Sequence, residues 1–149
     1  MSLKEKINVD LKEAMKAKDK VKLQTIRSIR ALILEFEKSG KSEEMKKEDE
    51  ISLLTSAAKK RKESIEQYKN AGRDDLAANE EAELNVIQEY LPKQLTEEEI
   101  SKKIKALAEE LGALTKQDFP KLMPAAMKEL KGQADGKVVK EIVTNILGS

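Results

Sequence analysis

Residues 51–91 read ISLLTSAAKKRKESIEQYKNAGRDDLAANEEAELNVIQEYL, and this stretch decides the fold. Apolar residues recur in it at intervals of three or four, as they do along one face of an α-helix. Gly72 stops the first helical pattern, Asp74 is expected to cap the second, and Pro92 directly afterwards prevents its continuation. Two helices joined by so short a turn are expected to pack antiparallel, as a hairpin.

The first helix of this hairpin carries a heptad-like stripe that Arg61 interrupts. Its apolar positions are Ile51, Leu54, Ala58, Ile65 and Tyr68, and those of the second helix are Leu76, Leu84, Ile87 and Leu91. These positions are the expected core of the hairpin.

Two further helices are expected before the hairpin. Ser2 and Glu5 have the spacing of a capping box, which predicts that the first helix begins at Ser2. A break at residues 17–19 separates it from a second helix, which we expect Gly40 to end. The apolar positions of this second helix alternate spacings of three and four: Ile26, Ile29, Ile33 and Phe36.

After the hairpin, residues 92–95 (PKQL) have the character of a linker. A new capping box, Thr96 with Glu99, starts the next helix immediately afterwards. Thr115 is expected to cap a second helix there, which Pro120 and Pro124 should bend or split. Residues 135–136 (DG) are expected to open the last helix. The sequence therefore predicts an all-α protein, with an N-terminal helical domain at residues 1–92 and a small three-helix module at residues 93–149.

Composition excludes several classes of chemistry. The chain has no cysteine and no histidine, so it offers neither a disulfide, nor a Cys/His zinc site, nor a thiolate nucleophile, nor an imidazole base. Neither a Walker pattern nor GxGxxG occurs. We therefore identify no catalytic residue and expect no metal and no cofactor. No apolar run is long enough to cross a membrane and no signal peptide is evident, so we expect no membrane partner and a cytoplasmic location.

The most informative basic segment is residues 128–140, KELKGQADGKVVK. A glycine bend, exposed backbone amides and the start of a helix lie there beside lysines, a combination that can hold a phosphate or another anion. Residues that only end one helix and begin the next would produce a similar sequence. The residues therefore leave both interpretations open. The candidate RNA-binding residues are Lys128, Lys131, Gly132, Lys137 and Lys140.

A candidate secondary basic surface lies in the N-terminal domain. Its members are Lys59, Lys60, Lys62, Arg27 and Arg30. Clustered cations displace counterions from nucleic acid. A charge run of this kind is more often a solvated helix face whose lysines pair with glutamates one turn away. Tyr68 and Tyr90 are expected to pack in the core rather than to stack on bases.

The sequence closely resembles the GatB/YqeY family over residues 61–100 and 121–139. The most specific pieces are AGRxDL at residues 71–76, YLPKQL at residues 90–95 and KGxADG at residues 131–136. This resemblance implies a helical N-terminal domain followed by a small helical domain similar to the tail of the B subunit of tRNA-dependent amidotransferase. In that enzyme the tail grips the tRNA body while other domains perform the chemistry.

The resemblance also implies an association with carbon–nitrogen ligase activity that uses glutamine as the amido-N-donor. Expected partners are tRNA and components of an amidotransferase or an aminoacyl-tRNA synthetase. Gln133 stands where the family often has another lysine, which removes one charge from the expected RNA-facing turn. Our leading hypothesis is a tRNA-associated accessory protein that is not catalytic by itself. The alternatives are a protein-interaction module with no RNA role and catalysis only within a complex.

Overall fold

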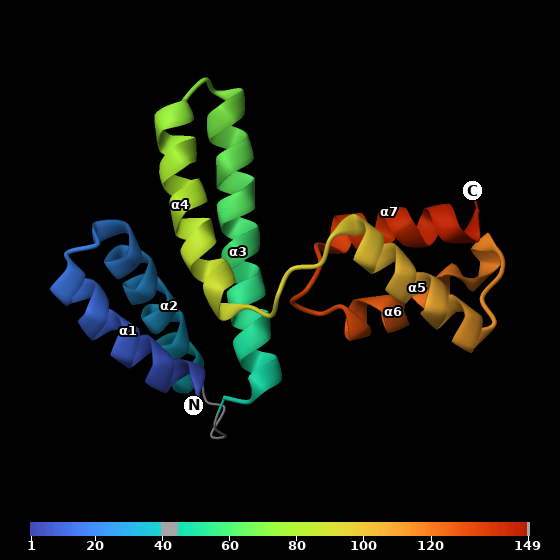
Figure 1. Cartoon of the computed structure of the whole chain (residues 1–149), viewed down its shortest axis with the longest axis horizontal. Coiled ribbons are helices and arrows are strands. Elements are labelled where there is room, and N and C mark those ends of the chain that lie inside the picture. Colours follow the sequence, from blue (N-terminus) through green and yellow to red (C-terminus); the bar gives the residue numbers. More distant parts are fainter. Residues whose placement is uncertain (40–44, 149) are drawn as a thin grey trace. The chain divides into compact units, whose positions relative to one another are not determined.

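The structure is a computed structural model, and it describes residues 1–39 and 45–148 (Figure 1). Its elements are α1 (Leu3–Ala17), α2 (Lys20–Lys38), α3 (Lys47–Asn70), α4 (Asp74–Tyr90), α5 (Glu97–Leu111), the short 3₁₀ helix η1 (Lys116–Asp118), α6 (Phe119–Glu129) and α7 (Gly136–Leu147). The described residues contain no strand, so the predicted all-α class is confirmed. By their contacts the residues fall into two compact units, Met1–Leu91 and Pro92–Ser149.

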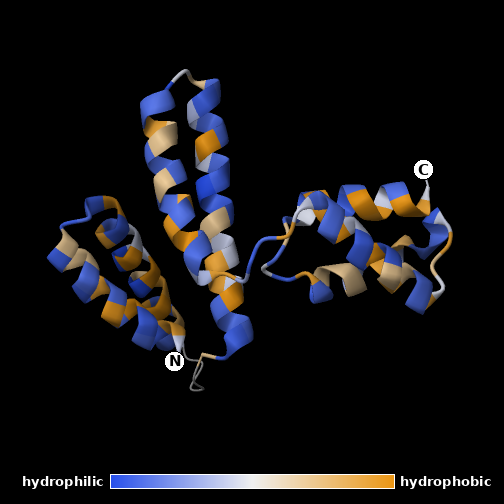
Figure 2. Cartoon of the chain, viewed as in Figure 1, coloured by the Kyte–Doolittle hydropathy of each residue, from blue (hydrophilic) through white to orange (hydrophobic). Residues whose placement is uncertain are grey.

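The first unit contains two helical hairpins, α1 with α2 and α3 with α4 (Figure 1). Figure 2 shows hydrophobic and hydrophilic residues alternating along each helix, as expected where one face is buried. The buried faces meet in one core, whose most enclosed side chains are Ile7, Ile26, Ile29, Leu54 and Ile87. The predicted α3–α4 hairpin is therefore present.

Two expected helix ends in this unit need comment. Asp74 does not cap α4: Arg73 is the capping residue and makes no side-chain hydrogen bond to the helix, while Asp74 is the first helical residue. Gly72, in the left-handed conformation (φ +72°), makes the turn where the sequence predicted it, and α4 begins one residue earlier than a cap at Asp74 would give. Asp74 instead places a negative charge in the first turn, where the helix dipole favours it. Gly40, expected to end α2, lies outside the described residues, and α2 ends at Lys38.

The second unit has a core of its own, centred on the fully buried side chains of Ile104, Leu122, Leu130, Val139 and Val143. The predicted capping box forms, because the Thr96 hydroxyl accepts from the Glu99 amide at 3.2 Å. Its partner bond joins the Thr96 amide to Glu99 Oε1 at 3.3 Å. Thus α5 begins where the sequence indicated.

The middle helix of this unit is split, as the two prolines predicted. The split falls between η1 and α6, one residue before Pro120, and Pro120 occupies the first turn of α6, where its missing amide hydrogen is not needed. Pro124 lies inside α6. The unit begins at Pro92, one residue before the expected start of the module at residue 93.

Candidate nucleic-acid interface

The connection between α6 and α7 is a tight turn built around Gly132. Its φ is +79°, in the left-handed region that other residues enter only at a cost. The Gln133 amide donates to the Leu130 carbonyl at 2.9 Å, and the Leu130 side chain is buried in the core of the unit. Gly132 is itself buried. Of the candidate RNA-binding residues, it is therefore the one that the fold encloses.

The linker at residues 92–95 docks on this same turn. The Leu95 amide donates to the Gln133 carbonyl at 2.9 Å, and Gln94 Nε2 donates to the Gly132 carbonyl at 2.6 Å. Gln94 Nε2 also lies 3.2 Å from the Pro92 carbonyl oxygen. Two of the most specific sequence pieces, residues 90–95 and 131–136, thus contact each other, and their shared role is to close the C-terminal unit.

The amino end of α7 already holds a carboxylate. Asp135 Oδ1 accepts from the Lys137 amide at 2.9 Å, and the Asp135 carbonyl accepts from the Val139 amide at 3.0 Å. A carboxylate at this position satisfies a helix-terminal donor and supplies the negative charge that the helix dipole attracts. These backbone amides therefore serve to begin α7 rather than to bind an external anion.

The four candidate lysines, Lys128, Lys131, Lys137 and Lys140, are all exposed. Within the part of the chain that the structure describes, none of them forms an ion pair. A lysine that forms no ion pair keeps its charge available to an external anion. The lysines therefore differ from the amides of the same segment, which are already bonded.

One face of α7 is an open, exposed surface. The residues on it are Lys137, Lys140, Glu141, Thr144 and Asn145. They recur at intervals of three and four, so they share one side of the helix, opposite the buried Val139, Val143 and Leu147. The Thr144 hydroxyl donates to the Lys140 carbonyl at 2.8 Å.

The sequence analysis missed Lys93. Its side chain is exposed, and it stands next to Gln94, which bonds to the carbonyl of Gly132 beside Lys131. Lys93 is thus a fifth exposed lysine, next to the residues of the linker that dock on the α6–α7 turn. Lys93 belongs to the PKQL motif, so the sequence contained this lysine. Only the hydrogen bond from Gln94 to Gly132, 38 residues away, shows that its segment lies at the turn.

The secondary basic set of the N-terminal domain is not one surface. Lys59 and Lys60 are exposed on α3 and, with Leu32 and Phe36 of α2, line a groove between these two helices. Arg27 lies nine residues before Phe36. Nine residues are two and a half helical turns, so Arg27 is on the side of α2 opposite the groove. Arg30, exposed and three residues after Arg27, shares that opposite side, and Lys62 is half-buried and already has an interaction.

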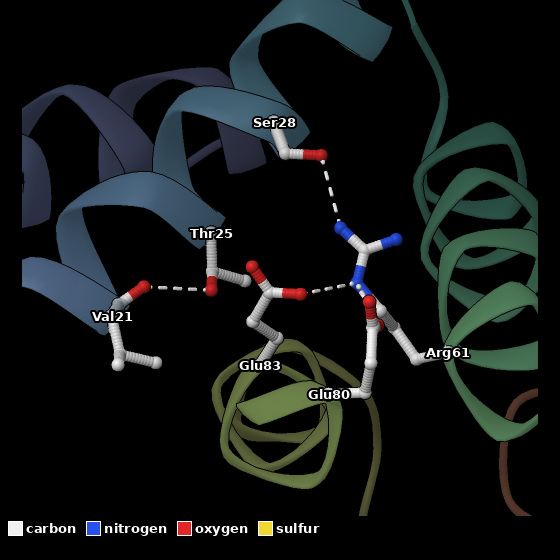
Figure 3. Close-up of polar contacts among 6 residues, drawn as sticks. All are labelled: Val21, Thr25, Ser28, Arg61, Glu80 and Glu83. Atoms are coloured by element: carbon white, nitrogen blue, oxygen red, sulfur yellow. Dashed lines mark hydrogen bonds and ion pairs between the residues drawn. The ribbon is translucent and has the colours of Figure 1, made fainter. Parts of the chain in front are cut away.

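Arg61, in the middle of the same basic run, points into the N-terminal unit (Figure 3). Its Nε lies 3.1 Å from Glu83 Oε2 and 3.5 Å from Glu80 Oε2, both on α4, and its Nη2 donates to Ser28 Oγ of α2 at 3.3 Å. The Nε makes ion pairs but no well-formed hydrogen bond among the described residues. Burial, then the charge of Glu83, raise the pKa of Glu80, and the charge of Arg61 opposes them. Arg61 therefore binds three helices together rather than contacting a ligand.

The linker motif docks on the α6–α7 turn, and the Leu130 side chain anchors that turn in the core of the unit. A family model described as Yqey-like protein matches residues 4–147. The chain belongs to this YqeY-like family. The family resemblance noted in the sequence is confirmed in this respect.

Two curated relatives of this YqeY-like chain come from fungi. The protein named altered inheritance of mitochondria protein 41, mitochondrial, from Pyrenophora tritici-repentis is 33% identical over 148 residues, which cover 97% of this chain and 80% of that protein. The protein of the same name from Saccharomyces cerevisiae (strain YJM789) is 37% identical over 134 residues, 86% of this chain and 68% of that protein.

These names contradict the expected cytoplasmic location, because they describe the relatives of this YqeY-like chain as mitochondrial proteins. The predicted cytoplasmic location was wrong because of the observation on which it rested. It rested on the lack of a long apolar segment, whereas mitochondrial transit peptides are amphipathic and rich in arginine rather than apolar.

The described residues of this YqeY-like chain include neither a candidate membrane span nor a cluster of metal ligands. Among those residues, no helix is both long and apolar enough to cross a lipid bilayer. No three acidic side chains there gather as ligands for a metal ion.

Proposed function

We propose that this YqeY-like chain is a tRNA-associated accessory protein whose C-terminal unit binds RNA through exposed lysines. The observation that carries the proposal is the set Lys128, Lys131, Lys137 and Lys140, which is exposed and, among the described residues, has no ion pair. Lys93, brought to the same turn by the linker, adds to it.

The electrostatics favour a contact that is local and weak. Residues 92–149 contain ten lysines and nine acidic residues, so the net charge of the unit is only +1 (10 − 9). Three of those acids, Glu97, Glu98 and Glu99, lie in the first turn of α5. Phosphate binding therefore depends on the clustering of lysines at one site. Each phosphate neutralised by a lysine releases condensed counterions, so affinity should fall steeply with salt.

The same resemblance supports a link to glutamine-dependent amide transfer onto aminoacyl-tRNA. In this proposal the chain holds the RNA, and a partner, such as a component of an amidotransferase or an aminoacyl-tRNA synthetase, supplies the chemistry. Phosphoryl activation needs a nucleotide site, and glutamine hydrolysis needs an activated nucleophile. The chain has neither a cysteine nor a histidine to act as nucleophile or base. The proposal therefore assigns it no catalysis of its own.

The test is binding of bulk tRNA to the full chain between about 50 and 200 mM salt. The double variant Lys131→Glu with Lys137→Glu should weaken binding at least about tenfold, because two attractions become repulsions. The matched control, Lys102→Glu with Lys105→Glu, makes the same change of charge on exposed positions of α5 and should have a much smaller effect. Binding that is absent or insensitive to salt, or an equal loss in the control, would eliminate the proposal.

A second candidate is a protein-interaction module without an RNA role. The observation that favours it is the groove of about 700 Å³ between α2 and α3, whose lining includes Leu32, Phe36, Leu53 and Ala57. A groove with an apolar floor suits an amphipathic helix of another protein. Affinity purification after nuclease treatment separates the two functions: partners that survive nuclease favour this candidate, and partners that are lost with the RNA favour the first.

A further inference from the structure

The outer face of α7 carries more than cations. Lys137 and Lys140 occupy its amino-terminal half, and Glu141, Thr144 and Asn145 continue the same face towards its carboxyl end. From Lys137 to Asn145 the face extends about 12 Å at 1.5 Å per residue. A site for phosphate alone would have no use for the last three residues, and Glu141 would weaken it.

Each of these three side chains can accept a hydrogen bond from a hydroxyl group. The Glu141 carboxylate is an acceptor only. The Thr144 hydroxyl donates its hydrogen to the Lys140 carbonyl at 2.8 Å, so its oxygen can only accept a further hydrogen bond. The Asn145 amide both accepts and donates. The ribose 2′-hydroxyl is the group in RNA that such acceptors would bind, and DNA lacks it.

The side chains of this unit do not suit the reading of bases. All ten of its basic residues are lysines, which bind phosphates as point charges. The planar guanidinium of arginine, which suits bidentate hydrogen bonds to guanine, is absent from residues 92–149. Its single aromatic residue, Phe119, packs against the core of the unit, so it is not placed to stack on an unpaired base. The remaining aromatic residues, Phe36, Tyr68 and Tyr90, belong to the other unit and are all half-buried.

We infer that the outer face of α7 binds double-helical RNA across its minor groove, through phosphates at Lys137 and Lys140 and ribose 2′-hydroxyls at Glu141, Thr144 and Asn145. The minor groove of A-form RNA is wide and shallow and displays 2′-hydroxyls between the phosphate rows, so a rigid helix face with cations beside acceptors matches it. Recognition of this kind distinguishes RNA from DNA and ignores base sequence. The inference rests on the proposed function and adds to it the structural class of the RNA.

The test measures binding of the full chain to three labelled probes by fluorescence anisotropy at one salt concentration. The probes are a stem of about 16 base pairs, the length that other minor-groove readers span, made as RNA and as DNA, and the single RNA strand. The RNA duplex should bind at least about fivefold more tightly than either other probe. Replacing the base sequence of the duplex should change the affinity less than twofold.

Variants assign the discrimination to named side chains. The double variant Thr144→Val with Asn145→Ala should weaken binding of the RNA duplex to the level of the DNA duplex and leave the DNA affinity unchanged. Lys137→Gln with Lys140→Gln should weaken both duplexes by a similar factor, because it removes only phosphate contacts. The matched control is Gln117→Ala, an exposed polar residue of η1 that lies off this face. It should change neither affinity.

Three results would overturn the inference while leaving RNA binding itself intact: equal affinity for the RNA and DNA duplexes, tighter binding of the single strand, or unchanged discrimination in the Thr144→Val with Asn145→Ala variant. Circular dichroism of each variant guards against misfolding. Failure of every probe to bind would remove the proposed function and the inference together.

Discussion

Gly132 shows how a single residue can be essential to a candidate site without contacting the ligand. The sequence marked it as part of an RNA-facing turn, yet the residue is buried, holds a φ of +79° and accepts a hydrogen bond from Gln94 through its carbonyl oxygen. Its conformation is what allows the turn to return the chain to α7. A side chain at this position would strain the turn that carries the lysines.

Gly132→Ala should therefore reduce the free energy of unfolding of the C-terminal unit by about 1 to 3 kcal/mol, the cost of a non-glycine residue in the left-handed region. Gly136→Ala is the matched control. Gly136 is not among the glycines with positive φ, and an added Cβ there would meet Met127 Cε at 3.4 Å. Alanine also has the higher helix propensity, so the control should be neutral or slightly stabilising. Urea denaturation measures both changes, and an equal loss in the two variants would contradict the role given to Gly132.

Tyr90 is the second residue whose environment can be tested directly. Its hydroxyl donates to Asp10 Oδ2 at 2.6 Å, which joins α4 to α1, and the Lys6 ammonium lies 5.2 Å from its ring centre. Burial, followed by the hydrogen bond to Asp10 and the charge of that residue, raises the pKa of the Tyr90 phenol above its ordinary value. The sequence predicted that Tyr90 packs in the core. Asp10 is the hydrogen-bond partner of its hydroxyl group there.

A raised pKa in the folded state means that this phenol stabilises the fold fully below its unfolded pKa of about 10 and loses that contribution as pH rises towards the folded pKa. Tyr90→Phe should cost about 1 to 2 kcal/mol at neutral pH, because the hydrogen bond to Asp10 is lost. The difference from the wild type should shrink above about pH 10. Urea unfolding of both proteins at neutral and alkaline pH measures it, and a constant difference would count against this assignment.

At the scale of elements, the Arg61 contacts hold α2, α3 and α4 together. The Arg61 and Glu83 side chains are only 19% and 12% exposed, so their attraction is weakly screened by solvent. The exposed pair Lys69–Glu81 connects the same two helices of the hairpin at 2.9 Å, with 57% and 47% exposure. The two ion pairs therefore allow a direct comparison of an enclosed contact with a solvated one.

Arg61→Met should lower the free energy of unfolding by about 2 to 4 kcal/mol, because it leaves two partly buried carboxylates without their cation. Lys69→Met, the control, should cost less than about 1 kcal/mol. With Arg61 gone, the pKa of Glu80, already raised, loses the interaction that lowers it. A raised carboxyl pKa destabilises the fold as pH rises through it, so the defect of Arg61→Met should be largest at neutral pH and smaller near about pH 5. Equal losses in the two variants would refute this account of Arg61.

Elements with local signals were predictable from the sequence, and long-range contacts were not. The helix starts at Ser2, Thr96 and Asp135 depend on caps within three residues, and all three form. Arg61 interrupts the apolar stripe of α3, but its carboxylate partners lie on α4, so no local pattern predicted the ion pairs that it forms. The docking of residues 94–95 on the α6–α7 turn involves no local pattern, so Lys93 was missed and Gly132 was assigned to the surface.

At the scale of the whole molecule, each of the two units has its own hydrophobic core. The charge is uneven across them: residues 1–39 carry +4 (10 − 6), residues 40–91 carry −4 (9 − 13) and residues 92–149 carry +1 (10 − 9). Attraction of a polyanion therefore depends on local clusters of charge rather than on the net charge of +1.

A unit with a separate core should fold by itself. A fragment of residues 92–149 should be helical and unfold cooperatively on heating, although its small size makes its stability modest. A fragment of residues 96–149 should be less stable, because it lacks the hydrogen bonds that Gln94 and the Leu95 amide make to the turn. Circular dichroism during heating compares the two. A longer fragment that shows no cooperative transition, or no advantage over the shorter one, would contradict the role of the linker.

The most direct test of the central claim is the salt dependence of tRNA affinity for the full chain and for its Lys137→Gln, Lys140→Gln variant. If these lysines contact phosphates, the variant should bind more weakly, and the slope of log affinity against log salt should be shallower by about 0.7 to 0.9 for each lysine removed. The same affinity and the same slope in the two proteins would show that the lysines of α7 do not bind RNA.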